Sequence, residues 1–232
     1  MTYDQVVKAI FLSRPNRFIA KVLVNEQKET VHVKNTGRCR ELLIPGCTVY
    51  LAGSDNPNRK TKYDLVAVEK ERQGRASLLI NMDSQAPNEA AAEWLPRSGI
   101  FSERAAIRRE VTYGDSRFDV YIEDGERKAF VEVKGVTLEQ DGVVLFPDAP
   151  TERGVKHLHE LCRAIDDGYE AYLLLVIQMK DIHLFRPNVA THPAFAEALQ
   201  MAAARGVQIL AMDCIVTPDS MVIDKPMAVE LG

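Results

Sequence analysis

The stretch SRFDVYIEDGERKAFVEVKGVTL, residues 116–138, predicts a β-hairpin on which the interpretation of the second half of the chain depends. Apolar residues recur along its first strand at Phe118, Val120 and Ile122, with the period of two that is typical of a half-buried strand. Asp124-Gly125 is a turn signal, and a second alternating run follows it. The pattern therefore indicates two antiparallel strands joined by a short turn.

The register of this hairpin decides which side chains meet. If the turn takes residues 124–127, Glu123 pairs with Lys128 and Asp119 lies directly opposite Glu132. A slip of one residue would turn the whole second strand over, because side chains alternate between the two faces of a sheet. The expectation that both carboxylates share a face is conditional on this register.

Two carboxylates and a lysine on one sheet face, among Val and Phe, favour a metal site. Each buried charge needs a partner, and Mg²⁺ or Mn²⁺ takes oxygen ligands, often one or two carboxylates completed by water and phosphate oxygens. Lys134 points the same way as Glu132 and is suited to orient a metal-bound water or to stabilise charge on a phosphate. Asp119, Glu132 and Lys134 fit the PD-(D/E)xK nuclease core and are the candidate catalytic set. The alternative is a solvated face with cross-strand ion pairs.

The overall composition is that of an ordinary globular protein. The chain has 232 residues, of which 46% are hydrophobic and 27% charged, enough for one large or two small domains. No apolar run approaches the length of a membrane span, and the first residues lack the order of a signal peptide. The four cysteines are scattered without a CxxC pair, which indicates reduced thiols and a cytoplasmic location.

The charge is distributed unevenly between the two halves of the chain. The net charge is −4, which by itself argues against nucleic acid. Residues 1–82, however, hold 14 Lys and Arg against 8 Asp and Glu, a local balance of +6. Such asymmetry is a hint of a polyanion-binding module joined to a different one, although chance unevenness is an equal alternative.

Residues 18–80 predict a small β-barrel. Five short strand-like runs with no long helix between them favour an OB-like barrel, and they lie at 18–24, 29–34, 47–52, 62–68 and 76–82. The loops between them carry candidate nucleic-acid-binding residues, namely Arg38, Arg40, Arg59, Lys60 and Lys62. The backbone N–H groups of residues 35–37 are further candidates for phosphate contacts. Solvated loops that protect edge strands remain the alternative.

The rest of the chain predicts an α/β domain with a mixed sheet. A helix is expected from an Asn88 N-cap, a second helical piece over 102–108, and a longer helix that Thr151 caps and Gly168 ends. Arg153 and His157 share one face of that helix, opposite its apolar stripe, and we expect them to reach phosphate if this end of the helix lies against the hairpin. The apolar run 172–178 indicates a strand that is buried on both faces.

Two further expectations concern the site and the boundary between domains. Glu110 is either a third carboxylate of the metal site or a charge on an edge strand. We expect the first domain to cover residues 1–84 and the second residues 85–232.

Several stretches together resemble the sugar fermentation stimulation protein A family. They are, in order, NTGRCRELLIPG, NPNRKTKYDL, SRFDVYIED, FVEVKGVTL and FPDAPTERGVKHLHEL, between about residue 32 and residue 161. The last of these blocks makes the resemblance much more specific than the nuclease pattern alone. The chain departs from the family at Gly135, where Ser is more usual, and at Cys39, where Met is usual, and neither change touches a proposed charge.

The resemblance implies an N-terminal OB-like barrel followed by a PD-(D/E)xK nuclease-like domain. It also implies non-specific DNA binding and a regulatory role in sugar metabolism, notably that of maltose. Carried over by position, Asp119, Glu132 and Lys134 match the nuclease triad. Because a nuclease fold does not by itself establish cleavage, the resemblance leaves the activity open.

Three functional hypotheses follow from the sequence. The first is a DNA-binding protein that contacts phosphates through the basic barrel, with single- or double-stranded DNA undecided. The second is an Mg²⁺- or Mn²⁺-dependent nuclease at the triad, and the third is a regulator whose metal site is vestigial. The charge distribution favours binding and the complete triad favours chemistry, and the two are compatible. The sequence carries no clear signal for an oligomeric state.

Overall fold

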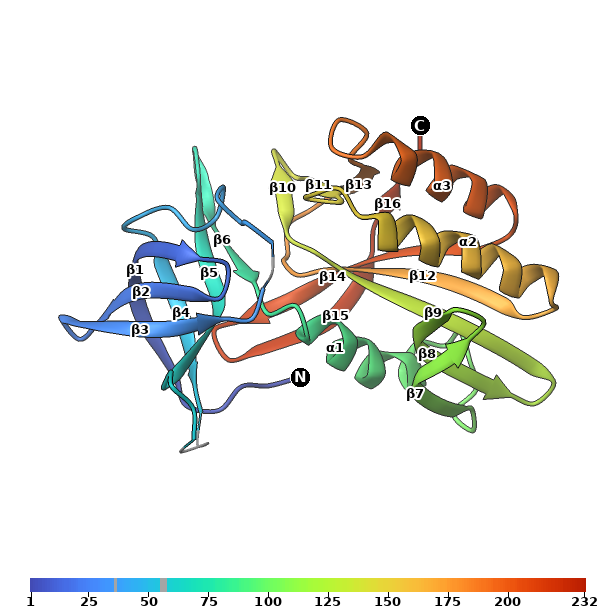
Figure 1. Cartoon of the computed structure of the whole chain (residues 1–232), viewed down its shortest axis with the longest axis horizontal. Coiled ribbons are helices and arrows are strands. Elements are labelled where there is room, and N and C mark those ends of the chain that lie inside the picture. Colours follow the sequence, from blue (N-terminus) through green and yellow to red (C-terminus); the bar gives the residue numbers. More distant parts are fainter. Residues whose placement is uncertain (36, 55–57) are drawn as a thin grey trace. The chain divides into compact units, whose positions relative to one another are not determined.

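The structure is a computed structural model that describes residues 1–35, 37–54 and 58–232. The chain forms two compact units (Figure 1). The first contains Met1–Ala86 together with two later segments, Gln178–Asp181 and Cys214–Val222, and the second contains the remaining residues. The division after Ala86 lies two residues beyond the boundary expected after residue 84, and the two later segments were expected in the second domain.

The first unit is built around a closed barrel. Its strands are β1 (Val6–Asn16), β2 (Ile19–Val24), β3 (Gln27–Val33), β4 (Thr48–Gly53), β5 (Tyr63–Arg72) and β6 (Arg75–Asn81). They follow the order β3-β2-β1-β4-β5-β6, and a parallel pairing of β3 with β5 closes the first five into a ring. This is the OB topology that the sequence predicted.

The barrel differs from the prediction in which strands form it. The first 17 residues were given no strand, yet β1 pairs with both β2 and β4 and is indispensable to the ring. Register shifts after Phe11 and Ser13 let this strand of 11 residues curve around the barrel. The predicted strand 76–82 corresponds to β6, which pairs only with β5 and lies outside the ring.

The second unit contains most of a six-stranded mixed sheet, whose strand order is β15-β14-β12-β9-β8-β7. The strands are β7 (Ala106–Tyr113), β8 (Ser116–Asp124), β9 (Arg127–Val136), β12 (Glu170–Ile177), β14 (Gln208–Thr217) and β15 (Ser220–Pro226). The predicted buried strand is β12, which runs parallel to both β9 and β14 and is almost entirely buried.

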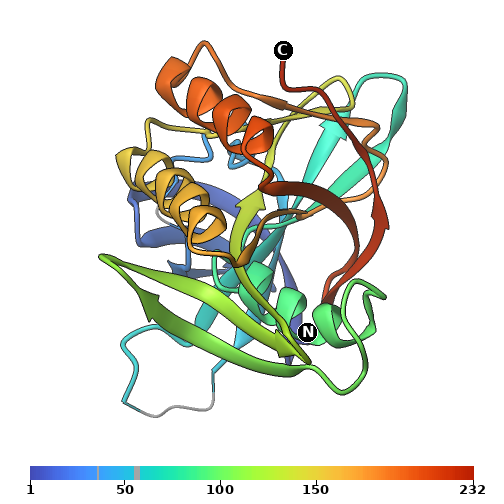
Figure 2. The ribbon, with the colours of Figure 1, turned by 90° about the vertical axis from the view of Figure 1, so that its right-hand side faces the viewer.

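A smaller four-stranded sheet has the order β10-β11-β13-β16. Its strands are β10 (Leu138–Gln140), β11 (Val143–Phe146), β13 (Leu184–Pro187) and β16 (Ala228–Val229). The helices are α1 (Ala86–Trp94), the short 3₁₀ helix η1 (Leu95–Arg97), α2 (Glu152–Asp166) and α3 (Pro193–Ala204). Helices α2 and α3 lie side by side, and α2 packs on β8, β9 and β12 (Figures 1 and 2).

Helix boundaries follow the expected capping chemistry in α2 but not in α1. Thr151 caps α2, since its Oγ1 accepts the Gly154 N–H at 3.0 Å, and Gly168 follows the helix with a φ of +86°. The expectation for Asn88 was wrong, because α1 begins at Ala86 and Asn88 lies inside it. The helical piece expected over 102–108 was also wrong, because β7 begins at Ala106.

Two further features of the structure concern the cysteines and the lengths of the helices. All four cysteines lie in the described part of the chain as thiols, and only Cys47 is not fully buried. No helix in the described part of the chain is both long enough and apolar enough to cross a membrane.

Candidate functional site: an Asp–Glu–Lys constellation and a basic barrel face

The register of the β8–β9 hairpin is the one on which the site depends. Glu123 pairs with Lys128 and Val120 with Val131, which confirms the predicted turn, and the paired residues end there, next to Asp119 on one strand and Glu132 on the other. The regular alternation, however, breaks at Asp119. The rings of Phe118 and Tyr121 both contact Phe130, with centroids 5.1 and 4.9 Å away, although unbroken alternation would put residues 118 and 121 on opposite faces.

This break turns the Asp119 carboxylate toward the neighbouring strand. Its Oδ2 accepts the backbone N–H of Val133 at 2.8 Å, a donor that a regular ladder would direct to a backbone carbonyl. Its Oδ1 accepts from the Asn88 side chain of α1, also at 2.8 Å. Two neutral donors thus hold the carboxylate beside Glu132.

Glu132 is the most enclosed charge of the site. Its side chain is 2% exposed, and its Oε1 is contacted by both the Lys134 ammonium and Nδ1 of His157. The other oxygen, Oε2, is buried and has no hydrogen-bond partner among the described residues. A buried carboxylate oxygen without a donor is costly, so this atom marks a place where a cation or a proton donor would be stabilised.

His157 supports Glu132 rather than facing solvent. Its side chain is 6% exposed, and Nε2 accepts from Nε of Arg153 at 3.3 Å, which assigns the ring proton to Nδ1 and makes that atom the donor to Glu132. Arg153 and His157 were expected opposite the apolar stripe of the helix, but the His157 ring is buried against Phe118 and Glu132, so this end of the helix does contact the hairpin. A phosphate contact of these two residues stays a prediction. Arg153 remains exposed.

The environment moves the pKa values of the two carboxyl groups in opposite directions. Burial, and then the nearby charge of Glu132, raise the pKa of Asp119 above its usual value. Burial alone would raise the pKa of Glu132 as well, but the His157 hydrogen bond and the Lys134 charge outweigh it and lower that pKa. Such a separation between two neighbouring carboxyls is a feature of functional sites.

The donor set fits a hard divalent cation. Two carboxylates lie together, one of them with an unused buried oxygen, and carboxylate oxygens are the ligands that Mg²⁺ and Mn²⁺ prefer. No group of three His, Cys, Asp or Glu side chains gathers into a larger metal centre among the described residues. The third predicted ligand, Glu110, is an exposed residue of β7 whose carboxylate lies 3.6 Å from the Arg117 guanidinium. The structure therefore does not bring Glu110 into the Asp119–Glu132 pair.

Some of the predicted nucleic-acid-binding residues of the barrel are exposed to solvent, and others are held by contacts within the protein. Arg38, Arg40, Lys60 and Lys62 are exposed, and the Lys62 ammonium lies 5.1 Å from the centre of the Tyr63 ring. Arg59 is instead held by Asp64 through both of its terminal nitrogens, one of them at 2.8 Å. Of the predicted phosphate contacts from the backbone at 35–37, residue 36 lies outside the described part of the chain.

A polar depression lies where β3 and β5 close the barrel. It measures about 500 Å³ and is lined by His32, Lys34, Arg59, Lys60, Thr61, Asp64 and Gln85. His32 pairs with Asp64 across the closing strands, and its Nδ1 lies 3.0 Å from the carboxylate. This basic hollow lies beside the β4–β5 loop, which in OB barrels contributes to nucleic-acid contacts.

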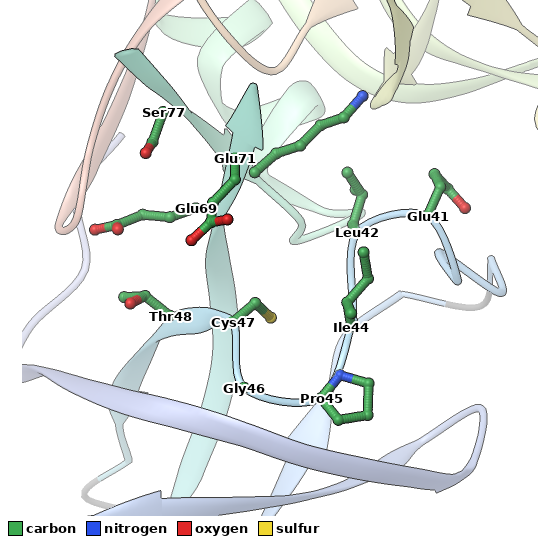
Figure 3. A pocket seen from close by; sticks show the side chains of 11 residues that line it. Glu41, Leu42, Ile44, Pro45, Gly46, Cys47, Thr48, Glu69, Glu71 and Ser77 are labelled. Atoms are coloured by element: carbon green, nitrogen blue, oxygen red, sulfur yellow. The ribbon is translucent and has the colours of Figure 1, made fainter. Parts of the chain in front are cut away.

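The first unit has a second cavity, of about 400 Å³, on another part of the barrel (Figure 3). Leu42, Ile44 and Pro45 line one side of it, and Glu69 and Glu71 of β5 face them (Figure 3). None of the predicted site residues lines this cavity.

Two residues of the Asp–Glu–Lys site were missed or misread in the sequence. Asn88 was interpreted as a helix cap, and its contact with Asp119 joins positions 31 residues apart that no local pattern connects. His157 was placed on the wrong face of α2. The sequence did contain a signal for the burial of His157. This residue is adjacent to Leu158 of the apolar stripe, so it can lie at the edge of that stripe.

The fold and the site together define a class of two-domain protein, an OB barrel followed by a nuclease-like mixed sheet that carries an Asp, Glu-x-Lys constellation. Residues 12–78 match the family described as the SfsA N-terminal OB domain, and residues 85–220 match the sugar fermentation stimulation protein RE domain. The chain belongs to the sugar fermentation stimulation protein family.

Relatives of the same name cover nearly the whole chain. A sugar fermentation stimulation protein homolog of Desulfitobacterium hafniense (strain Y51) is 60% identical over 221 residues, covering 95% of this chain and 94% of the relative. The homolog of Ruminiclostridium cellulolyticum is 52% identical over 231 residues and is covered completely, as is this chain. The solved structure of Pyrococcus furiosus SfsA in complex with Ca²⁺ has a TM-score of 0.84 at 29% identity, covering 99% of this chain and 98% of that one.

Proposed function

We propose that this protein binds DNA through its phosphates, without strong sequence preference, on the basic loops of the barrel. The observation that carries the proposal is the exposed set of Arg38, Arg40, Lys60 and Lys62 on the barrel loops, of which Lys60 lines the hollow at the barrel closure. Lysine and arginine on exposed loops neutralise phosphates, which supplies affinity but no sequence information. The described residues before α1 contain no helix that could enter a major groove, so no recognition helix is available in the barrel.

The test is a titration of labelled duplexes of unrelated sequence at several salt concentrations. We expect similar affinities for all duplexes, and a logarithm of the binding constant that falls linearly with the logarithm of the salt concentration. A footprint that is confined to one sequence and survives an excess of unrelated competitor would contradict the lack of specificity. The absence of any binding at low salt would contradict the proposal as a whole.

A second function, divalent-cation-dependent cleavage of a phosphodiester bond, is favoured by a different observation. The buried Oε2 of Glu132 has no partner among the described residues and lies in a carboxyl pair with Asp119, which suits a cation-binding role. The Pyrococcus furiosus relative was solved in complex with Ca²⁺, which supports a cation site in this chain as well. A bound Mg²⁺ or Mn²⁺ would supply Lewis acidity toward a phosphate oxygen or an activated water.

The side chains of this site divide the remaining tasks. Asp119 and Glu132 would hold the cation, and the donors Asn88 and His157 keep those two carboxylates in place. Lys134, which is 19% exposed, is the one member that can turn from Glu132 toward a phosphate or a water. We therefore assign Lys134 to the substrate and not to the cation.

This assignment is tested by separating cation binding from cleavage. Calorimetry with Mn²⁺ should show binding to wild type and to Lys134→Ala, but not to Asp119→Asn or Glu132→Gln. Cleavage of single- and double-stranded DNA and RNA, with Mg²⁺ or Mn²⁺ and with EDTA as the blank, should be lost in all three variants. The matched control is Lys128→Ala, an exposed lysine on the same strand. If wild type binds neither cation at millimolar concentration, the cation site is rejected; if Lys134→Ala cleaves as well as Lys128→Ala, the role of Lys134 is rejected.

A further inference from the structure

Phe18 is an exposed aromatic residue in the turn between β1 and β2. Half of its surface is exposed, and it is the only aromatic residue among the exposed large hydrophobic side chains of the described chain. An exposed phenylalanine ring does not gain the stabilisation that burial would give. A ring of this size that faces solvent is therefore a candidate for contact with a ligand.

The backbone of this turn is held rigidly. The Asn16 side-chain oxygen accepts the N–H groups of Phe18 and Ile19, at 2.9 and 3.1 Å. The Phe18 carbonyl accepts the N–H of Val33, the last residue of β3, at 2.8 Å. The ring is therefore presented from a fixed position on the barrel, directly beside the point where the basic loop after β3 begins.

Arg14 joins this turn to the basic loop. Its guanidinium donates to the carbonyl oxygens of Arg17, Asn35 and Arg38, each at 2.7 Å. These partners are neutral, so they leave the positive charge of Arg14 in place. Two exposed arginines, Arg17 and Arg38, thus have their backbones tied to one guanidinium next to the exposed ring.

The chemistry of this patch, an aromatic face among cations, matches a single-stranded nucleic acid. Single strands are bound by a positive groove that follows the phosphates and by aromatic rings on which unpaired bases stack. The Arg17 guanidinium lies 5.9 Å from the centre of the Phe18 ring, near the outer limit of a cation–π contact, so it covers the ring only loosely. Paired bases inside a duplex do not expose their faces, and a duplex would use only the charges.

We infer that Phe18 is a stacking platform for an unpaired base, with Arg17 and Arg38 contacting the adjacent phosphates. The inference rests on the proposed DNA binding and adds that one face of the barrel distinguishes single strands from duplexes. Phe18 was not among the residues predicted from the sequence, because the apolar run 18–24 placed it at the start of a strand, whereas β2 begins only at Ile19.

The test compares Phe18→Leu and Phe18→Trp with wild type on three matched oligonucleotides: a single strand, its duplex, and a strand of the same length without bases. We expect Phe18→Leu to weaken single-strand binding by about tenfold, the size of one lost base–aromatic stack, and to leave duplex and abasic binding unchanged. Phe18→Trp should restore single-strand affinity, and its fluorescence should be quenched by the single strand more than that of wild type, whose only tryptophan is Trp94.

Two controls separate stacking from other effects. The salt dependence of single-strand binding should be the same in Phe18→Leu as in wild type, because the slope counts phosphates, whereas Arg38→Ala should reduce it. Val189→Ala, at another exposed apolar residue, should behave as wild type. If wild type binds both DNA forms and Phe18→Leu binds the single strand equally well, the stacking role is rejected while the proposed function stands. If wild type binds no nucleic acid, both are rejected.

Discussion

Glu132 depends on His157 more than its place in the nuclease pattern would suggest. The imidazole and Lys134 both contact the same carboxylate oxygen, and only the imidazole is nearly as buried as the carboxylate itself. Groups that orient a metal ligand in this way fix its position and its basicity, so their loss would weaken cation binding at the proposed site.

Replacing His157 with Ala should therefore weaken Mn²⁺ binding by about 10- to 100-fold. It should also lower the free energy of unfolding by about 1–3 kcal/mol, because Glu132 stays buried with one donor fewer. Calorimetry and denaturant unfolding measure the two effects. His159→Ala, two positions along α2 on its exposed side, is the matched control and should change neither quantity. Equal cation affinity in both variants would contradict the positioning role of His157.

Asp64 should make the stability of the barrel depend on pH. Burial would raise its pKa, but hydrogen bonds from Arg59 and His32 outweigh burial and hold the pKa below the ordinary value of 3.8. Because the folded-state pKa is the lower one, the stabilisation is fully present above the unfolded-state pKa and is lost as the pH falls through the folded-state pKa.

Asp64→Asn should consequently lower the free energy of unfolding at neutral pH by about 1–3 kcal/mol, the range for hydrogen bonds to a charged group. The difference between wild type and this variant should shrink as the pH falls below the unfolded-state pKa of Asp64 and through its lower folded-state pKa, since protonation then leaves both proteins with an uncharged group at this position. Chemical denaturation at several pH values measures the difference. A difference that stays constant down to acidic pH would show that the Arg59–Asp64 contact contributes no charge-dependent stability.

How far the sequence could predict individual residues depended on whether the relevant contact was local. Asp119, Glu132 and Lys134 could be proposed as a set because a hairpin register relates them, and that register is as predicted from the turn to the Val120–Val131 pair. Asn88 could not be found in this way, because its partner is 31 residues away and belongs to another element. The ion pair between Arg59 and Asp64 was missed although the two are only five positions apart. Whether a basic side chain of a loop pairs with an acid or faces solvent depends on the geometry of the loop, which the sequence does not show.

At the scale of elements, α2 is the helix on which the site relies, because it carries both Arg153 and His157. Its first turn is held by Thr151, whose hydroxyl accepts the Gly154 N–H. Without this acceptor one more N–H at the helix start is left to water, close to the turn that carries Arg153.

Thr151→Ala should lower the free energy of unfolding by about 1 kcal/mol, and Thr151→Ser should restore most of it. Urea denaturation followed by circular dichroism measures the change. Thr191→Ala, at a threonine outside the helices that accepts no such N–H in the described structure, is the control. A loss as large for Thr191→Ala as for Thr151→Ala would contradict the capping interpretation.

Elements were predicted well where periodicity was strong and poorly where tertiary pairing overrides composition. The strand β12 and the ends of α2 were correct, because a continuous apolar run and a threonine–glycine pair of boundaries are strong signals. Residues 102–108 have a composition that favours a helix, yet β7 begins among them. Pairing with β8 satisfies the backbone hydrogen bonds of these residues and outweighs their weak helix propensity. The break in alternation at Asp119 has no signature in the sequence at all.

At the scale of the whole molecule, the uneven charge is the feature that the proposed DNA binding uses. The excess of cations in the first 82 residues coincides with the barrel, and several of these cations are exposed on its loops. Arg59 should be excluded from the binding surface because Asp64 neutralises it. The proposed DNA-binding surface thus contains fewer cations than the 14 Lys and Arg residues of this segment.

Replacing Arg38, Arg40 and Lys60 with Ala together should weaken binding to all duplexes alike. The slope of the logarithm of affinity against the logarithm of salt concentration should flatten by about 0.9 for each phosphate contact that is lost. Fluorescence anisotropy at several salt concentrations measures this slope. The control replaces three exposed cations of the second unit, Lys128, Lys156 and Arg163, and a slope that falls equally there would place the DNA elsewhere than on the barrel.

The hydrogen bond from the Val133 backbone to Asp119 makes one nucleus a reporter of the whole site. An amide proton that points at a carboxylate resonates at a frequency set by the electron density on that oxygen, so the Val133 signal in a two-dimensional NMR spectrum reads the state of Asp119 directly. A cation that withdraws density from the carboxylate moves this single peak, whether or not any nucleic acid is present. The ligand preference of the protein can thus be surveyed ion by ion in solution, with no assay for turnover.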